Sequence, residues 1–194
     1  MKKIIPIVTA LSLTCFLISC GGDTQSQVST QTDSTKVAQE NKQATNNDLL
    51  TFTMTDTKGV IRQSSEWIGK KPVVINVWGT WCPPCRAEIP AFVKAYEIYK
   101  DKGIEILGVA VRDTPDKVLT FAGQNNMHWE MMLFTDEALQ KRFNIQSVPT
   151  TIFVDRTGKV MEIYNPRSKT MTESFSGAMH YEQFTGHLDS LLTL

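Results

Sequence analysis

The chain has 194 residues, and its 20 Lys and Arg residues balance 20 Asp and Glu residues, so the formal net charge at pH 7 is zero. No basic run with interleaved aromatic residues is present, and nucleic-acid binding is therefore not supported. The same neutrality gives no electrostatic reason to expect an anionic membrane surface or an acidic substrate as the partner.

The N-terminus predicts export from the cytosol. Lys2 and Lys3 precede an apolar stretch at residues 4–18 that is short for a membrane span, which is typical of a secretory signal peptide over residues 1–19. The Leu-Ile-Ser-Cys sequence that ends at Cys20 resembles the lipobox of bacterial lipoproteins. That resemblance implies that Cys20 is lipidated and anchors the mature protein to a membrane. The alternative is an ordinary signal peptide with an incidental cysteine.

Residues 20–48 follow as a lipidated N-terminus and a polar tether. Ser, Thr, Gln, Asn, Asp and Lys dominate this stretch without an apolar period, so it cannot bury a core. As a random coil it would hold the following domain at about 30 Å from the anchor. Residues 49–194 then contain enough apolar positions for one folded domain.

Under this prediction, only two of the four cysteines remain available as a reactive pair. Cys15 would leave with the signal peptide and Cys20 would carry the lipid, so only Cys82 and Cys85 remain as thiols. Export would place this pair where disulfides can persist.

The first half of the domain alternates strands and helices. Residues 50–54 and 60–61 predict a hairpin with a turn at 57–59, and residues 64–68 predict a short helical turn closed by Gly69. The continuous apolar run at 72–78 predicts a strand buried on both faces of a mostly parallel sheet. A helix with a kink at Pro90 follows Cys82 and ends before Lys102.

The second half continues this alternation and ends in a helix. Strands are predicted at 104–111, 129–134 and 148–154, and a tight turn at 155–158 leads into a return strand at 159–164. Residues 165–172 are predicted as a polar loop. Three helices are predicted. The first has the inward residues Val118, Leu119 and Phe121, and the second, capped by Thr135 or Asp136, has Ala138, Leu139 and Phe143. The third, at 181–192, has Phe184, Leu188 and Leu191. The result is an α/β domain.

The Trp81-Cys82-Pro83-Pro84-Cys85 sequence carries the chemistry. The prolines suit the first turn of a helix, which places Cys82 at or just before its N-terminus and Cys85 one turn further on. This spacing brings the two sulfurs within disulfide range. Unpaired N–H groups and the helix dipole stabilise a thiolate at the outer position. Cys82 is therefore the predicted nucleophile and Cys85 the resolving thiol.

The Trp-Cys-Pro-Pro-Cys sequence after a strand, the proline-containing helix and the later Val148-Pro149-Thr150 resemble the thioredoxin superfamily. The helix and strand inserted within 108–134, together with Glu88 and the anchor, resemble the TlpA-like and ResA-like thiol:disulfide oxidoreductases of bacterial envelopes. The resemblance implies a thioredoxin-like α/β fold, with a central mixed sheet flanked by helices, an N-terminal β-hairpin and the inserted helix and strand.

The resemblance also implies roles for three residues that would bind substrate. Pro149 would be the cis-proline that faces the cysteines, and Val148 would offer its backbone to an extended client segment. The alternative is a proline at the start of a strand. Trp81 would shield one side of the disulfide, or would serve as ordinary hydrophobic packing.

Glu88 is the third predicted catalytic residue. It lies three residues beyond Cys85 on the same helical face, so it could accept a proton or adjust the pKa of the pair. The alternative is an acid favoured by the helix dipole. Thioredoxin has a buried acid six residues before the first cysteine, and this chain has Asn76 there. An amide cannot accept that proton, which favours Glu88 as the substitute.

No metal and no cofactor is predicted, because His128, His180 and His187 lack the short spacings of metal ligands. The predicted function is the reduction of client protein disulfides, with apocytochrome c among the clients that the resemblance implies. A membrane or envelope dithiol would donate the electrons, and the domain would lie outside the cytoplasm, on the periplasmic side of a bacterial envelope. The alternatives are a disulfide-introducing oxidase or isomerase, a redox-inert peptide-binding module, and a peroxidase acting through Cys82.

Overall fold

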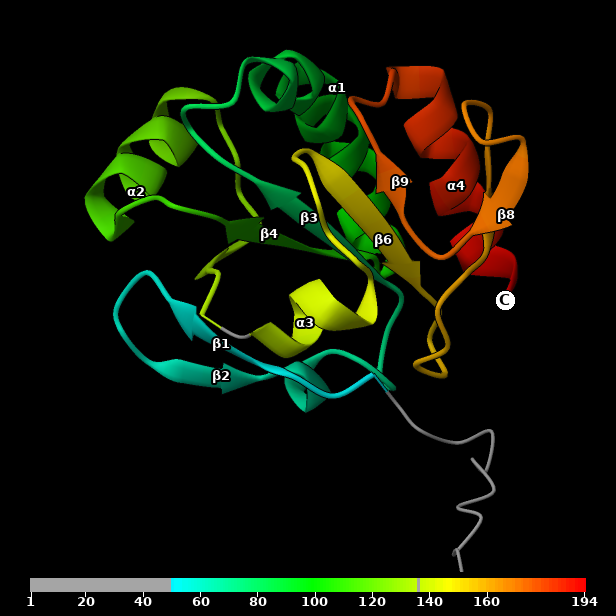
Figure 1. Ribbon diagram of the computed structural model, residues 1–194, viewed down its shortest axis with the longest axis horizontal. Helices are drawn as coiled ribbons and strands as arrows, with labels where there is room; N and C mark the ends of the chain where they lie inside the picture. The colour runs from blue at the N-terminus through cyan, green and yellow to red at the C-terminus, as the bar shows by residue number, and fades with distance from the viewer. Residues whose placement is uncertain (1–49, 136) are drawn as a thin grey trace, which may run out of the picture. The chain divides into compact units, whose positions relative to one another are not determined.

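The computed structural model describes residues 50–135 and 137–194 (Figure 1). The predicted signal peptide, the Cys20 anchor and the tether all lie outside the described residues, as does Asp136, one of the two predicted helix caps. None of the helices within the described ranges is long and apolar enough to cross a membrane.

A mixed sheet forms the centre of the domain. Its strand order is β2-β1-β5-β4-β3-β6-β9, with β3, β4 and β5 parallel and the other neighbours antiparallel. The predicted mixed sheet with an N-terminal hairpin is confirmed. The strand bounds are β1 Thr53–Asp56, β2 Ile61–Gln63, β3 Val73–Trp78, β4 Glu105–Ala110, β5 Glu130–Leu133, β6 Thr150–Val154 and β9 Phe175–Ser176.

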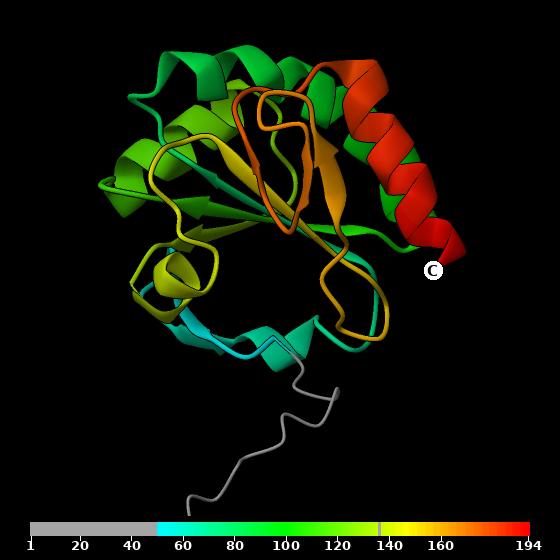
Figure 2. The ribbon, with the colours of Figure 1, turned by 45° about the vertical axis from the view of Figure 1, so that its right-hand side comes forward.

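Helices cover both faces of this sheet. Figures 1 and 2 show α1 and α4 together on one side and α3 on the other side, next to the β1-β2 hairpin. The rings of Phe92 and Phe184 stack with centroids 3.7 Å apart and join α1 to α4. The bounds are α1 Pro83–Tyr99, α2 Pro115–Gln124, α3 Glu137–Arg142 and α4 Tyr181–Thr193, with short 3-10 turns η1 Ser64–Glu66 and η2 Lys100–Lys102.

Strand β3 supplies side chains to two separate cores. All six of its residues are buried, as its continuous apolar run predicted. Val74 and Trp78 join the core under α1, α2 and α4, whereas Val73, Ile75 and Val77 join the core under α3. The alternation follows from the two-residue period of a strand.

The inward face of α2 differs from the predicted one at a single position. Val118 is fully buried and Phe121 is partly buried against the core, but Leu119 is 50% exposed, so the prediction that Leu119 faces inward is wrong. Residues Val118 and Ala122 are four apart and share the buried face. Leu119 is rotated by about 100° from Val118 and therefore points to solvent.

The region after β6 is also different from the predicted hairpin and loop. Val160 makes only an isolated bridge to Val154, and β7 (Ile163–Asn165) pairs with β8 (Thr170–Thr172) in a separate two-stranded sheet. The predicted return strand at 159–164 and the predicted loop at 165–172 are therefore wrong in part. The side chain of Asn165 accepts a hydrogen bond from the Arg167 N–H at 2.9 Å and stabilises the turn. A hairpin made of backbone pairs and turn contacts leaves no apolar pattern in the sequence.

Three segments meet at the carboxyl end of β3. Because β3 and β4 are parallel, the loops after them begin at the same edge of the sheet, and β6 starts there because it runs antiparallel to β3, with Val77 opposite Thr150. Residues 79–82, 111–113 and 147–149 are thereby brought together although they are far apart in sequence.

Candidate active site

The Cys82–Cys85 pair forms a disulfide at the N-terminus of α1, with the two Cα atoms 5.3 Å apart. Cys82 is the N-cap residue, and Pro83 and Pro84 occupy the first turn, as the spacing predicted. In the disulfide form Cys82 is 2% exposed and Cys85 is completely buried.

Few backbone donors remain for the Cys82 sulfur at this helix end. Pro83 and Pro84 have no N–H group, and the N–H of Arg86 donates to the Cys82 carbonyl at 3.1 Å. The N–H of Cys85 donates to the Cys82 sulfur at 3.3 Å. A thiolate at Cys82 would thus be stabilised by one direct backbone hydrogen bond in addition to the helix dipole.

The segment before β6 borders the disulfide on one side. The Val148–Pro149 peptide bond is cis, as the resemblance implied. The Cys82 Sγ atom lies 3.6 Å from the Val148 carbonyl oxygen, and the carbonyl of Pro149 accepts a hydrogen bond from the Gly177 N–H at 2.9 Å. Val148 is partly buried and Pro149 is buried. The backbone of Val148 therefore lies directly beside the predicted nucleophile.

Trp81 is exposed beside the disulfide and belongs to neither core. Its side chain is 45% exposed, its Nε1–H donates to the Val111 carbonyl at 3.0 Å, and the guanidinium of Arg112 lies 4.4 Å from its ring centroid. A Cβ atom at position 79 would lie 2.6 Å from the Trp81 Nε1 atom, so this indole position requires Gly79. The ring is held in place by the loop after β4.

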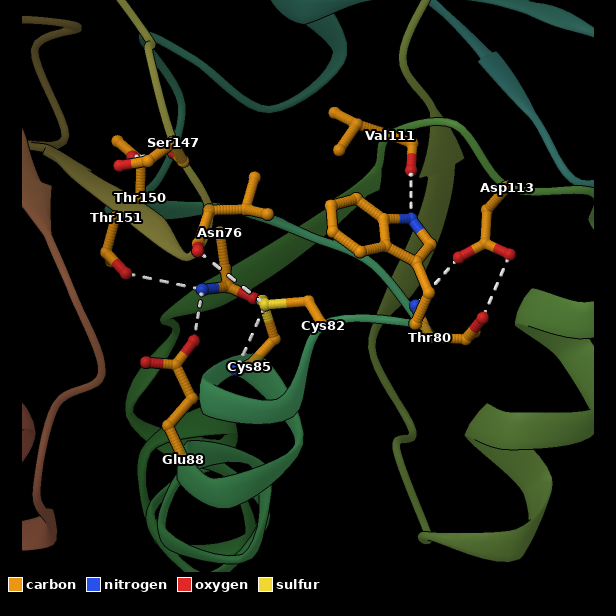
Figure 3. Close-up of a disulfide and its surroundings, with 12 residues drawn as sticks. Asn76, Thr80, Cys82, Cys85, Glu88, Val111, Asp113, Ser147, Thr150 and Thr151 are labelled. Atoms are coloured by element: carbon orange, nitrogen blue, oxygen red, sulfur yellow. Dashed lines mark hydrogen bonds between the residues drawn. A yellow bond between two sulfur atoms is a disulfide. The ribbon is translucent and has the colours of Figure 1, made fainter.

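Asp113 holds the segment that leads into Cys82, and the sequence interpretation missed it. One carboxylate oxygen accepts the Thr80 backbone N–H at 2.7 Å, and the other accepts the Thr80 hydroxyl at 2.9 Å. Figure 3 shows this pair on one side of the disulfide and Asn76 with Glu88 on the other. An acid just after the strand parallel to β3 was the available signal, because loops after parallel strands share an edge.

Glu88 and Asn76 are hydrogen-bonded to each other beside the disulfide. Glu88 is 2% exposed, and its carboxylate accepts hydrogen bonds from the Asn76 side-chain amide at 2.9 Å and the Met179 N–H at 3.1 Å (Figure 3). Asn76 also donates to the Thr151 hydroxyl at 3.3 Å. Burial raises the pKa of Glu88 from 4.5 to about 7, although both hydrogen bonds act in the opposite direction. This carboxyl therefore titrates near neutral pH.

Proteins with similar sequences are named as thiol-disulfide oxidoreductases. The AhpC/TSA family model matches residues 45–163. The thiol-disulfide oxidoreductase ResA of Geobacillus kaustophilus is 33% identical over 72% of this chain and 74% of its own length, and that of Bacillus subtilis is 33% identical over 66% and 69%. The chain belongs to the AhpC/TSA family. Within this family it is a ResA-like thiol-disulfide oxidoreductase.

The fold agrees with this assignment. A thiol:disulfide interchange protein of the thioredoxin family from Chlorobium tepidum superposes with a TM-score of 0.60 at 24% identity, covering 73% of this chain and 93% of that chain. The central mixed sheet flanked by helices is thus a thioredoxin-like fold, as the resemblance implied.

His128 and His187 make separate contacts in this oxidoreductase. The side chain of His128 is exposed, with its Nδ1 atom 3.5 Å from the Glu97 carboxylate, and the ring of His187 packs on Phe153 with centroids 5.0 Å apart. Burial lowers the pKa of His187. Within residues 50–135 and 137–194, no group of three or more His, Cys, Asp or Glu side chains could hold a metal ion.

We expect Glu88 to make the stability of this oxidoreductase fall as the pH rises. Below pH 4.5 the carboxyl is protonated in both states. Between 4.5 and about 7 the unfolded chain loses the proton while the folded protein keeps it, so folding becomes less favourable. Above this window the loss levels off at about 3 kcal/mol.

Urea unfolding of the wild type and of Glu88→Gln across this pH window measures the effect. The free energy of unfolding of the glutamine variant, relative to that of the wild type, should rise by about 3 kcal/mol between about pH 4 and about pH 8, because only the wild type loses stability over this range. A constant difference between them at every pH would contradict the assignment of this titration to Glu88.

Proposed function

We propose that this oxidoreductase is exported, is anchored to a bacterial membrane through a lipid on Cys20, and reduces disulfides in proteins of the cell envelope. The main support is the disulfide at the N-terminus of α1, where the Cys82 sulfur lies 3.6 Å from the Val148 carbonyl oxygen. This geometry provides a nucleophile and a backbone binding edge for a client at one place.

The reaction begins with the reduced pair. The Cys82 thiolate attacks one sulfur of the client disulfide, the client S–S bond breaks, and the released client thiolate takes up a proton. Cys85 then loses its proton and attacks the Cys82 sulfur of the mixed disulfide. The second client thiol leaves, and the Cys82–Cys85 disulfide forms. Two electrons thus pass from this protein to the client, and a membrane or envelope dithiol returns them.

In this proposal, the client is positioned by the residues that border the site, Trp81, Val148 and Pro149. An extended client segment binds the Val148 backbone by strand addition, which brings its disulfide to Cys82. Trp81 bounds the opposite side of the site, since its exposed ring is fixed by the Val111 carbonyl. Apocytochrome c cysteines are the clients that the ResA-like resemblance implies.

Glu88 accepts the proton of Cys85 in the second step. Both residues lie on one face of α1, three positions apart, and both are buried. A carboxyl with a pKa of about 7 is matched to a general base working near neutral pH. The amide of Asn76, bonded to the carboxylate at 2.9 Å, keeps Glu88 in place.

The sparse donors around Cys82 favour reduction as the direction of electron flow. A strongly stabilised thiolate makes the dithiol form stable and the disulfide oxidising. The prolines at 83 and 84 remove two N–H groups from this helix end, which limits that stabilisation. A measured potential near about −270 mV supports a reductant, and a value near about −120 mV would support the alternative, a disulfide-introducing oxidase.

Trapping of clients by Cys85→Ala tests the proposed function. Without the resolving thiol, mixed disulfides at Cys82 accumulate, and we expect envelope proteins with paired cysteines to be recovered from cells that express the full chain. Mass spectrometry of the adducts, compared with those of Cys82→Ser/Cys85→Ala, identifies them. Recovery of cytosolic proteins alone would contradict the location, and recovery equal to the double variant would contradict reduction of protein clients.

A further inference from the structure

Arg112 lies at the edge of the site in an unusual backbone conformation. Its φ is +51°, which non-glycine residues seldom adopt. Both of its neighbours contact the segment before Cys82: the carbonyl of Val111 accepts the Trp81 indole N–H, and the carboxylate of Asp113 accepts two hydrogen bonds from Thr80. These contacts hold the Arg112 backbone where its guanidinium lies on the Trp81 ring.

The charge of Arg112 has no acidic partner among the described residues. The closest carboxylate in sequence, Asp113, uses both oxygens for Thr80. Arg62 and Arg142, in contrast, form ion pairs with acids, at 2.5 Å to Glu66 and Glu173 respectively. Arg112 is exposed, so its guanidinium edge is available to a bound molecule.

A second arginine lies near Phe121, one of the residues that line the hollow next to Thr80. Arg86 directly follows Cys85, is exposed, and places its guanidinium 5.7 Å from the Phe121 ring centroid. Like Arg112, it makes no ion pair within the described residues. Asp116 and Lys117 also line this hollow and carry opposite charges that offset each other. With Arg86, Arg112 and Lys117 counted against Asp113 and Asp116, three positive and two negative charges, this edge of the site has an excess of one positive charge.

A stacked guanidinium is suited to binding a carboxylate. Stacking on an aromatic ring fixes the plane of the group while leaving its edge N–H donors free for two parallel hydrogen bonds. In the proposed function, a client segment lies between Val148 and Trp81 with its sulfur at Cys82. The residues that flank the client cysteine then pass the Trp81 ring, within reach of Arg112.

We propose that Arg112, with Arg86 as a second contributor, selects client proteins that carry an acidic side chain next to the reacting cysteine. This inference rests on the proposed function, because it requires a protein disulfide bound at Cys82. It assigns the guanidinium on Trp81 a specificity-determining role in that reaction.

This proposal can be tested with three synthetic disulfide peptides. They differ only in the residue beside the cysteine, which is Glu, Gln or Lys. With the reduced full domain at low salt, we expect the Glu peptide to be reduced about tenfold faster than the Lys peptide, with the Gln peptide between them. At about 0.5 M NaCl the difference should shrink to less than about threefold. Arg112→Gln should shrink it similarly at low salt, while Arg112→Lys should retain part of it.

Arg156→Gln is the matched control. Arg156 is exposed, and it follows the end of β6 opposite the site, so the variant loses the same charge elsewhere. It should keep the wild-type preference. Equal rates for the three peptides with the wild type, or an unchanged preference in Arg112→Gln, would overturn the inference. An equal loss in Arg156→Gln would also overturn it, in favour of overall charge.

The proposed function fails in a different way. If the wild type reduces no peptide faster than Cys82→Ser does, the oxidoreductase reaction with protein disulfides is contradicted. If it reduces all peptides above that background at one rate, the reaction stands and only the recognition by Arg112 is lost.

Discussion

Cys82→Ser is expected to abolish disulfide reduction. A serine hydroxyl stays protonated at neutral pH and forms no disulfide, so the first attack on a client cannot take place. We expect the rate of insulin reduction, followed by turbidity with dithiothreitol as the electron source, to fall at least about a thousandfold, to the rate without protein.

Cys85→Ala is the matched control for this experiment. The variant keeps the nucleophile, so it should still form one covalent adduct per molecule with a disulfide substrate, while turnover stops. Mass spectrometry after mixing with substrate distinguishes the two variants. Adduct formation by Cys82→Ser, or its absence in Cys85→Ala, would show that the roles of nucleophile and resolving thiol are reversed.

Glu88→Gln is expected to slow the resolving step about a hundredfold at neutral pH. The two carboxylate oxygens of Glu88 each accept one hydrogen bond, from Asn76 and from Met179. Glutamine has a single acceptor oxygen, so it can keep only one of these bonds, and it cannot accept a proton from Cys85. In the wild type the rate should rise as the pH increases through about 7, where Glu88 ionises, and the variant should lack this rise. Stopped-flow fluorescence of tryptophan after mixing with a disulfide substrate follows the step.

Glu97→Gln controls for the loss of an acid from the same helix. Glu97 is exposed and pairs with Lys100, so its removal should leave the rate and its pH dependence unchanged. Glu88→Gln with the wild-type pH profile would contradict a role in proton transfer and would leave Glu88 as a structural residue that bonds Asn76.

Local sequence patterns predicted the parts of the site that lie on one continuous segment. The apolar run of β3, the prolines after Cys82 and the three-residue spacing to Cys85 act over a few residues, and each corresponds to a feature of the structure. The match at Val148-Pro149-Thr150 depended on the superfamily resemblance, since no local rule connects residues so distant in sequence. Asn76 was noted as a departure, and the structure shows it bonded to Glu88.

Features that depend on tertiary contacts or on exposed backbone pairing were not predicted. The contact of Asp113 with Thr80 joins residues 33 positions apart and leaves no periodic trace. The β7-β8 hairpin lies mostly at the surface, so its polar residues resemble a loop, and the two-residue strand β9 is too short to show an alternating pattern. Leu119 was placed inward because it is apolar, although the i, i+4 face of α2 is already complete with Val118 and Ala122.

The nearly complete burial of the oxidised pair also determines how this protein exchanges electrons with its surroundings. With Cys82 only 2% exposed, a freely diffusing thiol or oxidant rarely reaches a sulfur at the angle that exchange requires. A partner that binds along the Val148 backbone, as in the proposed function, would bring its reacting sulfur to that position. In the proposed function, the pair therefore exchanges electrons faster with a docked protein than with a small thiol at equal concentration, and a small thiol such as dithiothreitol serves as the electron source only in excess.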